Sequence, residues 1–101
     1  MSLDLAHTLI KERELVPGNL EEAKRILLES VDTNPIARAY GLLAEIQYWK
    51  GEVAPKEEKI SIYEKGIEFG KKGVALGKDN IESNFWLGVC YGLLGEEQGI
   101  M

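Results

Sequence analysis

Apolar residues recur at steps of three or four through most of the chain, with polar residues between them. This spacing gathers apolar side chains on one face of a helix, whereas the alternation typical of a half-buried strand appears nowhere. The stretch 78–95 shows the spacing most clearly, through bulky residues at Ile81, Asn84, Leu87, Tyr91 and Leu94. The pattern predicts an all-α protein.

Proline, glycine and asparagine divide the first half of the chain into three predicted helices. Pro17 and Gly18 end the first helix, because proline disfavours a helical conformation at the residue before it and glycine tolerates the turn. Asn19 is a suitable N-cap for the second helix. Asn34 and Pro35 are expected to open the third helix as its cap and its first residue.

Two more helices are predicted after Gly51, where the third helix is expected to end. Pro55 lies near the first position of a helix that runs to about Leu76, and the fifth helix ends at Gly95. Glu96 then places negative charge where a following helix has its positive end. We therefore expect five helices and the start of a sixth, in one domain over 1–101 that is truncated at its C-terminal end.

Four glycines fall on one stripe of the expected fourth helix. They are Gly66, Gly70, Gly73 and Gly77. An interior glycine costs about 1 kcal/mol relative to alanine, so the stripe must serve a purpose. Either it lets this helix approach the third and fifth helices closely, at Ala44 and Gly88, or it lines a surface that a ligand backbone approaches. Close packing is the favoured interpretation.

Composition and charge narrow the classes of partner. A chain of 101 residues with 45% hydrophobic content suits one domain with its own core. Its 12 basic and 17 acidic residues give a net charge of -5, which argues against nucleic acid and against an anionic membrane surface. No apolar run approaches the roughly 20 residues of a membrane span.

The sequence shows little sign of a catalytic site or of a metal site. His7 is the only histidine, and no cysteine or serine in a strained turn accompanies it. The lone Cys90 lies in an apolar helical stretch, and no spacing of cysteine and histidine matches a metal site. We expect a protein that is not an enzyme and that carries no cofactor or metal.

The spacing of the glycines at the expected helix ends indicates an internal repeat. The gap from Gly18 to Gly51 is close to the period of about 34 residues of a helix-turn-helix repeat, and the gap from Gly51 to Gly95 fits with an insertion of about ten residues. A leucine, a small residue and a longer polar or aromatic residue precede the last two glycines, at Leu43, Ala44 and Gln47 and again at Leu87, Gly88 and Tyr91. With this frame the chain resembles the tetratricopeptide (TPR) repeat family.

The resemblance implies antiparallel helix hairpins stacked as a short TPR-like solenoid, whose concave face binds a peptide segment or a protein partner. On the family's frame, the residues of that face combine aromatic and charged side chains: Arg38, Glu45, Tyr48, Trp49, Glu82, Phe85, Trp86 and Val89. Aromatic rings bury large areas, and arginine can bind a carboxylate with two hydrogen bonds. The expected function is a non-catalytic protein–protein interaction module.

Two alternatives stay open. Trp49 and Phe85 could fill gaps between hairpins, which would make the chain a purely structural or oligomerisation scaffold. The segments 63–68, 85–89 and 92–101 also resemble the T-component proteins of TRAP transport systems. That resemblance implies a periplasmic accessory protein that works beside a substrate-binding protein or takes a hydrophobic ligand; otherwise a cytoplasmic protein is expected, and no targeting segment decides the compartment.

The C-terminal stretch predicts self-association. If 96–101 is only the start of a sixth helix, the apolar side of the fifth helix lacks a cover, and an uncovered apolar patch tends to find a partner. We expect a homo-oligomer that forms by exchange of terminal helices. The residues expected at its interface are Leu87, Tyr91, Leu94, Ile100 and Met101.

Overall fold

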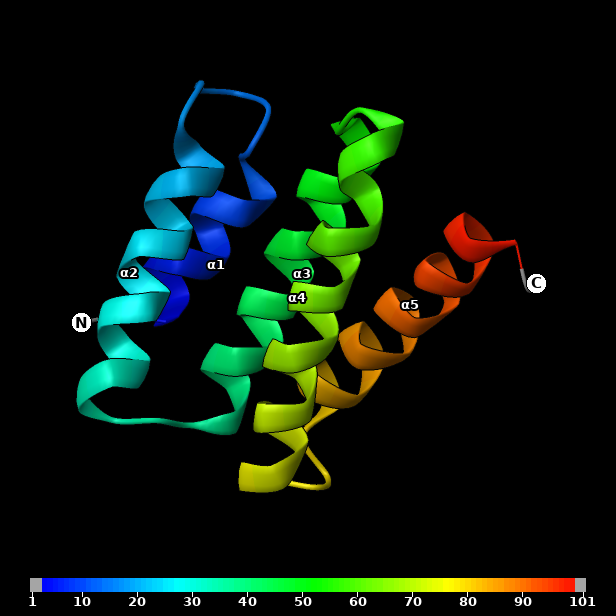
Figure 1. Ribbon diagram of the computed structural model, residues 1–101. Coiled ribbons are helices and arrows are strands. Elements are labelled where there is room, and N and C mark those ends of the chain that lie inside the picture. The colour runs from blue at the N-terminus through cyan, green and yellow to red at the C-terminus, as the bar shows by residue number, and fades with distance from the viewer. Residues whose placement is uncertain (1–2, 100–101) are drawn as a thin grey trace.

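The computed structural model describes residues 3–99, in which five helices follow one another without a strand (Figure 1). These helices are α1 (Leu3–Lys11), α2 (Asn19–Thr33), α3 (Ala37–Val53), α4 (Lys56–Leu76) and α5 (Ile81–Gln98). The all-α class expected from the apolar spacing is confirmed. None of the helices in this part of the chain is long and apolar enough to cross a membrane.

The helices form two hairpins followed by a single helix. α1 pairs with α2 and α3 with α4, while α5 packs against both α3 and α4 on the side away from the first hairpin (Figure 1). α3 contacts all four other helices. It is therefore the central element of the fold, and its position governs how the rest of the chain is arranged.

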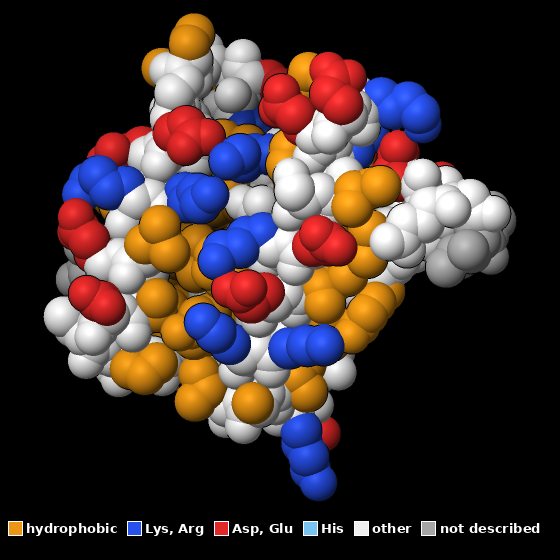
Figure 2. Space-filling model, viewed as in Figure 1, with side chains coloured by type: hydrophobic (Ala, Val, Ile, Leu, Met, Phe, Trp, Pro, Cys, Tyr) orange, Lys and Arg blue, Asp and Glu red, His pale blue; other side chains and the backbone are white. Residues whose placement is uncertain are grey.

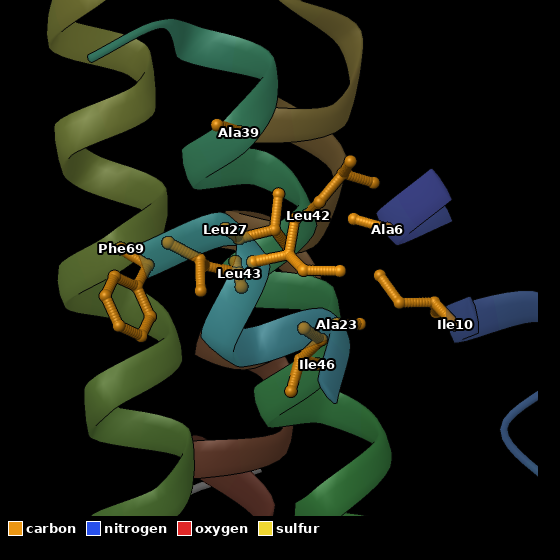
Figure 3. Packing of buried hydrophobic residues seen from close by; sticks show 11 residues of the cluster. Ala6, Ile10, Ala23, Leu27, Ala39, Leu42, Leu43, Ile46 and Phe69 are labelled. Atoms are coloured by element: carbon orange, nitrogen blue, oxygen red, sulfur yellow. The ribbon is translucent and has the colours of Figure 1, made fainter. Parts of the chain in front are cut away.

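The hydrophobic core lies where α1, α2 and α3 meet. Figure 3 shows Ile10 of α1 at one edge of this cluster and Phe69 of α4 at the other. α3 buries apolar residues on more than one face, because neighbours surround it, and this explains why its apolar residues do not form a single narrow stripe. Its contribution to the core consists of Ala39, Leu42, Leu43, Ala44 and Ile46.

The glycine stripe of α4 faces its neighbouring helices. The buried members are Gly66, Gly70 and Gly73. A Cβ added at Gly70 would lie 2.8 Å from the Leu87 Cβ, and one at Gly66 would lie 2.6 Å from the Cys90 Sγ. The close-packing interpretation is confirmed, but Gly88 takes no part, because a Cβ there would meet no atom within 4 Å.

The expected starts of α2 and α3 are wrong in detail. Gly18, with a φ of 92°, precedes α2, and the Asn19 side chain makes no cap: its amide instead donates a hydrogen bond to the Glu12 carbonyl oxygen at 3.0 Å. α3 begins only at Ala37, after Ile36 in an extended conformation. Asn34 and Pro35 therefore lie in the connection before α3, because the chain must stay extended to cross from the first hairpin to the second.

Gly51 and Gly95 lie inside helices rather than at their ends, so the expected ends of α3 and α5 are also wrong. α3 continues past Gly51, which is buried because the ring of Tyr63 occupies the place a side chain would take. α5 continues past Gly95 through Glu96, and Gly99, with a φ of 76°, ends it. No sixth helix begins at Glu96 in the part of the chain that is described.

The start of α5 is held firmly against α3. Asn80 caps α5, since its Oδ1 accepts a hydrogen bond from the Ser83 backbone nitrogen at 2.8 Å. The Ser83 hydroxyl in turn donates to the Ala37 carbonyl oxygen at 2.8 Å, and Ser83 is fully buried. These two bonds fix the end of α5 that carries the aromatic residues described next.

Candidate functional site

Four aromatic side chains from α3 and α5 form a continuous row, called the aromatic row below. The ring centroids of Trp49 and Tyr48 are 4.6 Å apart, and those of Tyr48 and Trp86 are 5.3 Å apart. Trp86 meets Phe85 edge to face at 4.8 Å. These spacings lie in the range of favourable aromatic pairs. The structure thus brings together four residues that the sequence assigned to a binding face.

The two ends of the aromatic row differ in burial. Trp49 and Trp86 are partly buried and pack against the hydrophobic core, which fits the gap-filling role left open for Trp49. Phe85 is 58% exposed, so it fills no gap within the chain. The row therefore combines rings anchored in the core with one ring that is exposed to solvent.

Arg13 covers the Trp49 end of the aromatic row. Its guanidinium carbon lies 3.3 Å from the centroid of the Trp49 ring, a cation–π contact, and Nη1 donates to the Ile10 carbonyl oxygen at 2.9 Å. The Trp49 indole nitrogen donates to Glu45 Oε2 at 3.0 Å. Sequence reasoning missed Arg13, because a contact between residues so far apart in the chain leaves no local pattern.

A small hollow of about 160 Å³ adjoins the same end of the row. Its walls come from the turn after α1 and from the ends of α2 and α3: Arg13, Glu14, Leu20, Trp49 and Val53. Val53 is 86% exposed, and Leu15 in the turn is 75% exposed. The apolar surface of the aromatic row therefore continues toward this end of the molecule.

Arg38, which was expected to bind a ligand carboxylate, is already paired within the chain. Its Nε donates to Glu82 Oε2 at 3.2 Å and its Nη1 to Asp4 Oδ1 at 3.4 Å. Nη2 lies 3.5 Å from His7 Nδ1. Arg38 thus connects α1, α3 and α5, and a ligand carboxylate would have to displace one of these acidic partners. Val89, the remaining residue of the expected set, is half-buried.

A second, larger hollow of about 410 Å³ lies between α4 and α5. Its walls are Glu64, Ile67, Glu68, Lys71, Tyr91 and Leu94, three of which are apolar or aromatic. Tyr91 and Leu94 were expected to mediate self-association, whereas Leu87 contacts Gly70 inside the chain. Ile100 and Met101, expected at the same interface, lie outside the described residues.

The Cys90 thiol shows no sign of nucleophilic activation. Burial raises the pKa of the Cys90 thiol to about 11, and its Sγ donates to the Ala44 carbonyl oxygen at 3.8 Å. A thiol held protonated in this way is a poor nucleophile at neutral pH. Within residues 3–99, no three histidine, cysteine or acidic side chains are grouped so that they could hold a metal ion.

No protein-family model, curated protein or solved structure matches the chain. The tetratricopeptide-like frame and the narrower likeness to T-component proteins therefore stay predictions.

Proposed function

We propose that this chain is a non-catalytic, TPR-like interaction module whose aromatic row binds an apolar segment of a partner protein. The observation that carries the proposal is the aromatic row itself, in which core-anchored tryptophans support the exposed ring of Phe85. Rigid aromatic residues of this kind provide much of the binding energy at protein interfaces.

The order of helix contacts supports the repeat-like part of this proposal. α3 packs on the hairpin before it, formed by α1 and α2, and α5 packs on the hairpin formed by α3 and α4. α3 and α5 therefore each pack against the two helices that precede them in the chain, as in a stack of helix hairpins. The row lies on these two helices, where the family's frame expects the binding face.

The charges around the aromatic row indicate which kind of segment would bind. Arg38 is neutralised by Asp4 and Glu82, and Glu45 accepts a hydrogen bond from the Trp49 indole nitrogen. The aromatic row thus offers an apolar surface, and the charged side chains beside it, Arg38 and Glu45, already have partners within the chain. A segment with bulky aliphatic or aromatic side chains suits this surface better than an acidic motif does, because an acidic motif would have to compete for Arg38.

Selection of peptides from a random library tests this function. We expect the selected peptides to share bulky apolar residues, and Phe85→Ala to weaken their binding by about tenfold, since it removes the most exposed ring of the row. Leu76→Ala is the matched control, because Leu76 is 51% exposed but lies on α4, which contributes no ring to the row. Equal affinities for the two variants would contradict the proposal.

The scaffold alternative has one observation in its favour. Trp49 and Trp86 pack against the core, so part of the aromatic row stabilises the fold whatever else it does. If the row served assembly alone, library selection would yield no peptide that depends on Phe85. Thermal unfolding of Phe85→Ala separates the two roles, since loss of an exposed ring should leave stability nearly unchanged.

A further inference from the structure

The hollow between α4 and α5 has the form of an open apolar groove with a charged rim, called the α4–α5 groove below. Ile67 forms its floor and is 8% exposed, whereas Tyr91 on the wall is 47% exposed. Figure 2, viewed from the α4 side, shows apolar side chains gathered along the boundary between α4 and α5. This surface is separate from the aromatic row, so an inference about it does not depend on the proposed function.

The rim charges of the groove are ordered along α4. Glu64 and Lys71 line the groove two helical turns apart, about 10 Å along the axis, and Ile67 lies between them. Neither Glu64 nor Lys71 enters an ion pair within residues 3–99. Glu68, by contrast, is paired with Lys65 at 2.8 Å. The groove therefore presents a free negative group at one end of its α4 wall and a free positive group at the other.

The order of the two unpaired charges is self-complementary, and the charge of Glu68, which would lie near the axis, is offset by Lys65 of the same chain. If two copies of α4 lie antiparallel about a two-fold axis, a residue near the N-terminal end of one copy faces a residue near the C-terminal end of the other. With the axis near Ile67, Glu64 of one copy comes opposite Lys71 of the other, and the same pair forms again on the far side of the axis. A parallel arrangement would instead place like charges together.

We propose that the α4–α5 groove is the interface of a homodimer in which two antiparallel copies of α4 pair across a two-fold axis near Ile67. Tyr91 and Leu94 of each copy cover the apolar floor of the interface. Each chain carries a net charge of -5, so two copies repel at long range and need specific opposite-charge pairs to associate. Salt screens both this repulsion and the pairs at the exposed rim, so charge reversal, and not ionic strength, distinguishes the two effects.

Charge reversal tests the dimer directly by sedimentation equilibrium. The wild-type chain should show a monomer–dimer equilibrium between micromolar and millimolar concentrations. Lys71→Glu should raise the dissociation constant at least about tenfold, because carboxylates then face each other at both ends of the interface. Lys78→Glu is the matched control: it makes the same change in net charge at an exposed residue outside the groove and should leave the equilibrium nearly unchanged.

A complementary variant makes the test specific to the proposed geometry. Glu64→Lys should dissociate the dimer as Lys71→Glu does, but an equimolar mixture of the two variants should form a heterodimer, because both opposite-charge pairs are then restored. The chain that carries both substitutions should form homodimers again. A monomeric wild-type chain at millimolar concentration, or a mixture that stays monomeric, overturns the proposal, as does a Lys78→Glu variant that dissociates equally.

Discussion

The helices of the α1–α2 hairpin pack in a different way from those of the unit formed by α3, α4 and α5, called the three-helix unit below. The hairpin joins the core through large side chains such as Ile10 and Leu27, both fully buried. In the three-helix unit, glycines bring the helix backbones themselves together: a Cβ added at Gly41 would lie 2.7 Å from the Ser83 backbone nitrogen. The hairpin should therefore suffer when side-chain volume is lost, and the three-helix unit when volume is gained.

This difference bears on function, because the aromatic row spans α3 and α5. The distance between these two helices is set at Gly41 and by the hydrogen bond from Ser83 to Ala37, not by the rings. Small shifts of α5 would separate Trp86 from Tyr48, whose centroids are 5.3 Å apart. The close contact of α3 with α5 is thus what keeps the row continuous.

Loss of volume in the hairpin should give the largest effect. Leu27→Ala should lower the free energy of unfolding by about 2–5 kcal/mol, because it leaves a cavity beneath α2 in a fully buried site. Urea denaturation measures the change. Leu28→Ala is the matched control, since Leu28 is 42% exposed and its truncation should cost much less. Similar losses for both variants would show that the hairpin does not depend on buried volume.

Gain of volume in the three-helix unit should give the next largest effect. Gly41→Ala should lower the free energy of unfolding by about 1–3 kcal/mol, because the added methyl group meets the Ser83 backbone and the Glu82 Cβ, neither of which can rotate away. The same variant should also weaken binding of peptides that use the aromatic row. If urea denaturation showed unchanged stability, the claim that the three-helix unit does not tolerate added volume would be contradicted.

A glycine outside the close contacts should behave in the opposite sense. Gly88→Ala should raise the free energy of unfolding by about 0.5–1 kcal/mol, since alanine is the better helix former and a Cβ there meets no atom within 4 Å. Thermal unfolding would show this as a higher Tm. A loss of stability would indicate that the exposed side of α5 is more constrained than these contacts show.

The sequence predicted the helices because a helix face depends on local spacing. A step of three or four residues specifies such a face without knowledge of its partner. The glycine stripe of α4 was predicted for the same reason, and its packing role is confirmed at Gly66 and Gly70. The four members of the aromatic row, by contrast, were assigned to a binding face through the frame of the repeat family that the chain resembles.

Features that depend on distant residues could not be predicted in this way. Gly51 was expected to end a helix, but the ring of Tyr63 packs against it from another helix. Gly95 and Gly99 are equally able to end α5 by local rules, and only Gly99 adopts the left-handed conformation. The contact of Arg13 with Trp49 likewise joins residues from different helical hairpins.

The most direct test of the central claim, that the aromatic row is a binding surface, is an NMR titration that follows the tryptophan indole N–H signals. The chain has two tryptophans, Trp49 and Trp86, and both belong to the row. Addition of a selected apolar peptide should shift the Trp86 indole signal in a saturable way, and Phe85→Ala should raise the peptide concentration needed for half-saturation about tenfold. Binding that leaves both indole signals unmoved while residues around Tyr91 shift would contradict the claim.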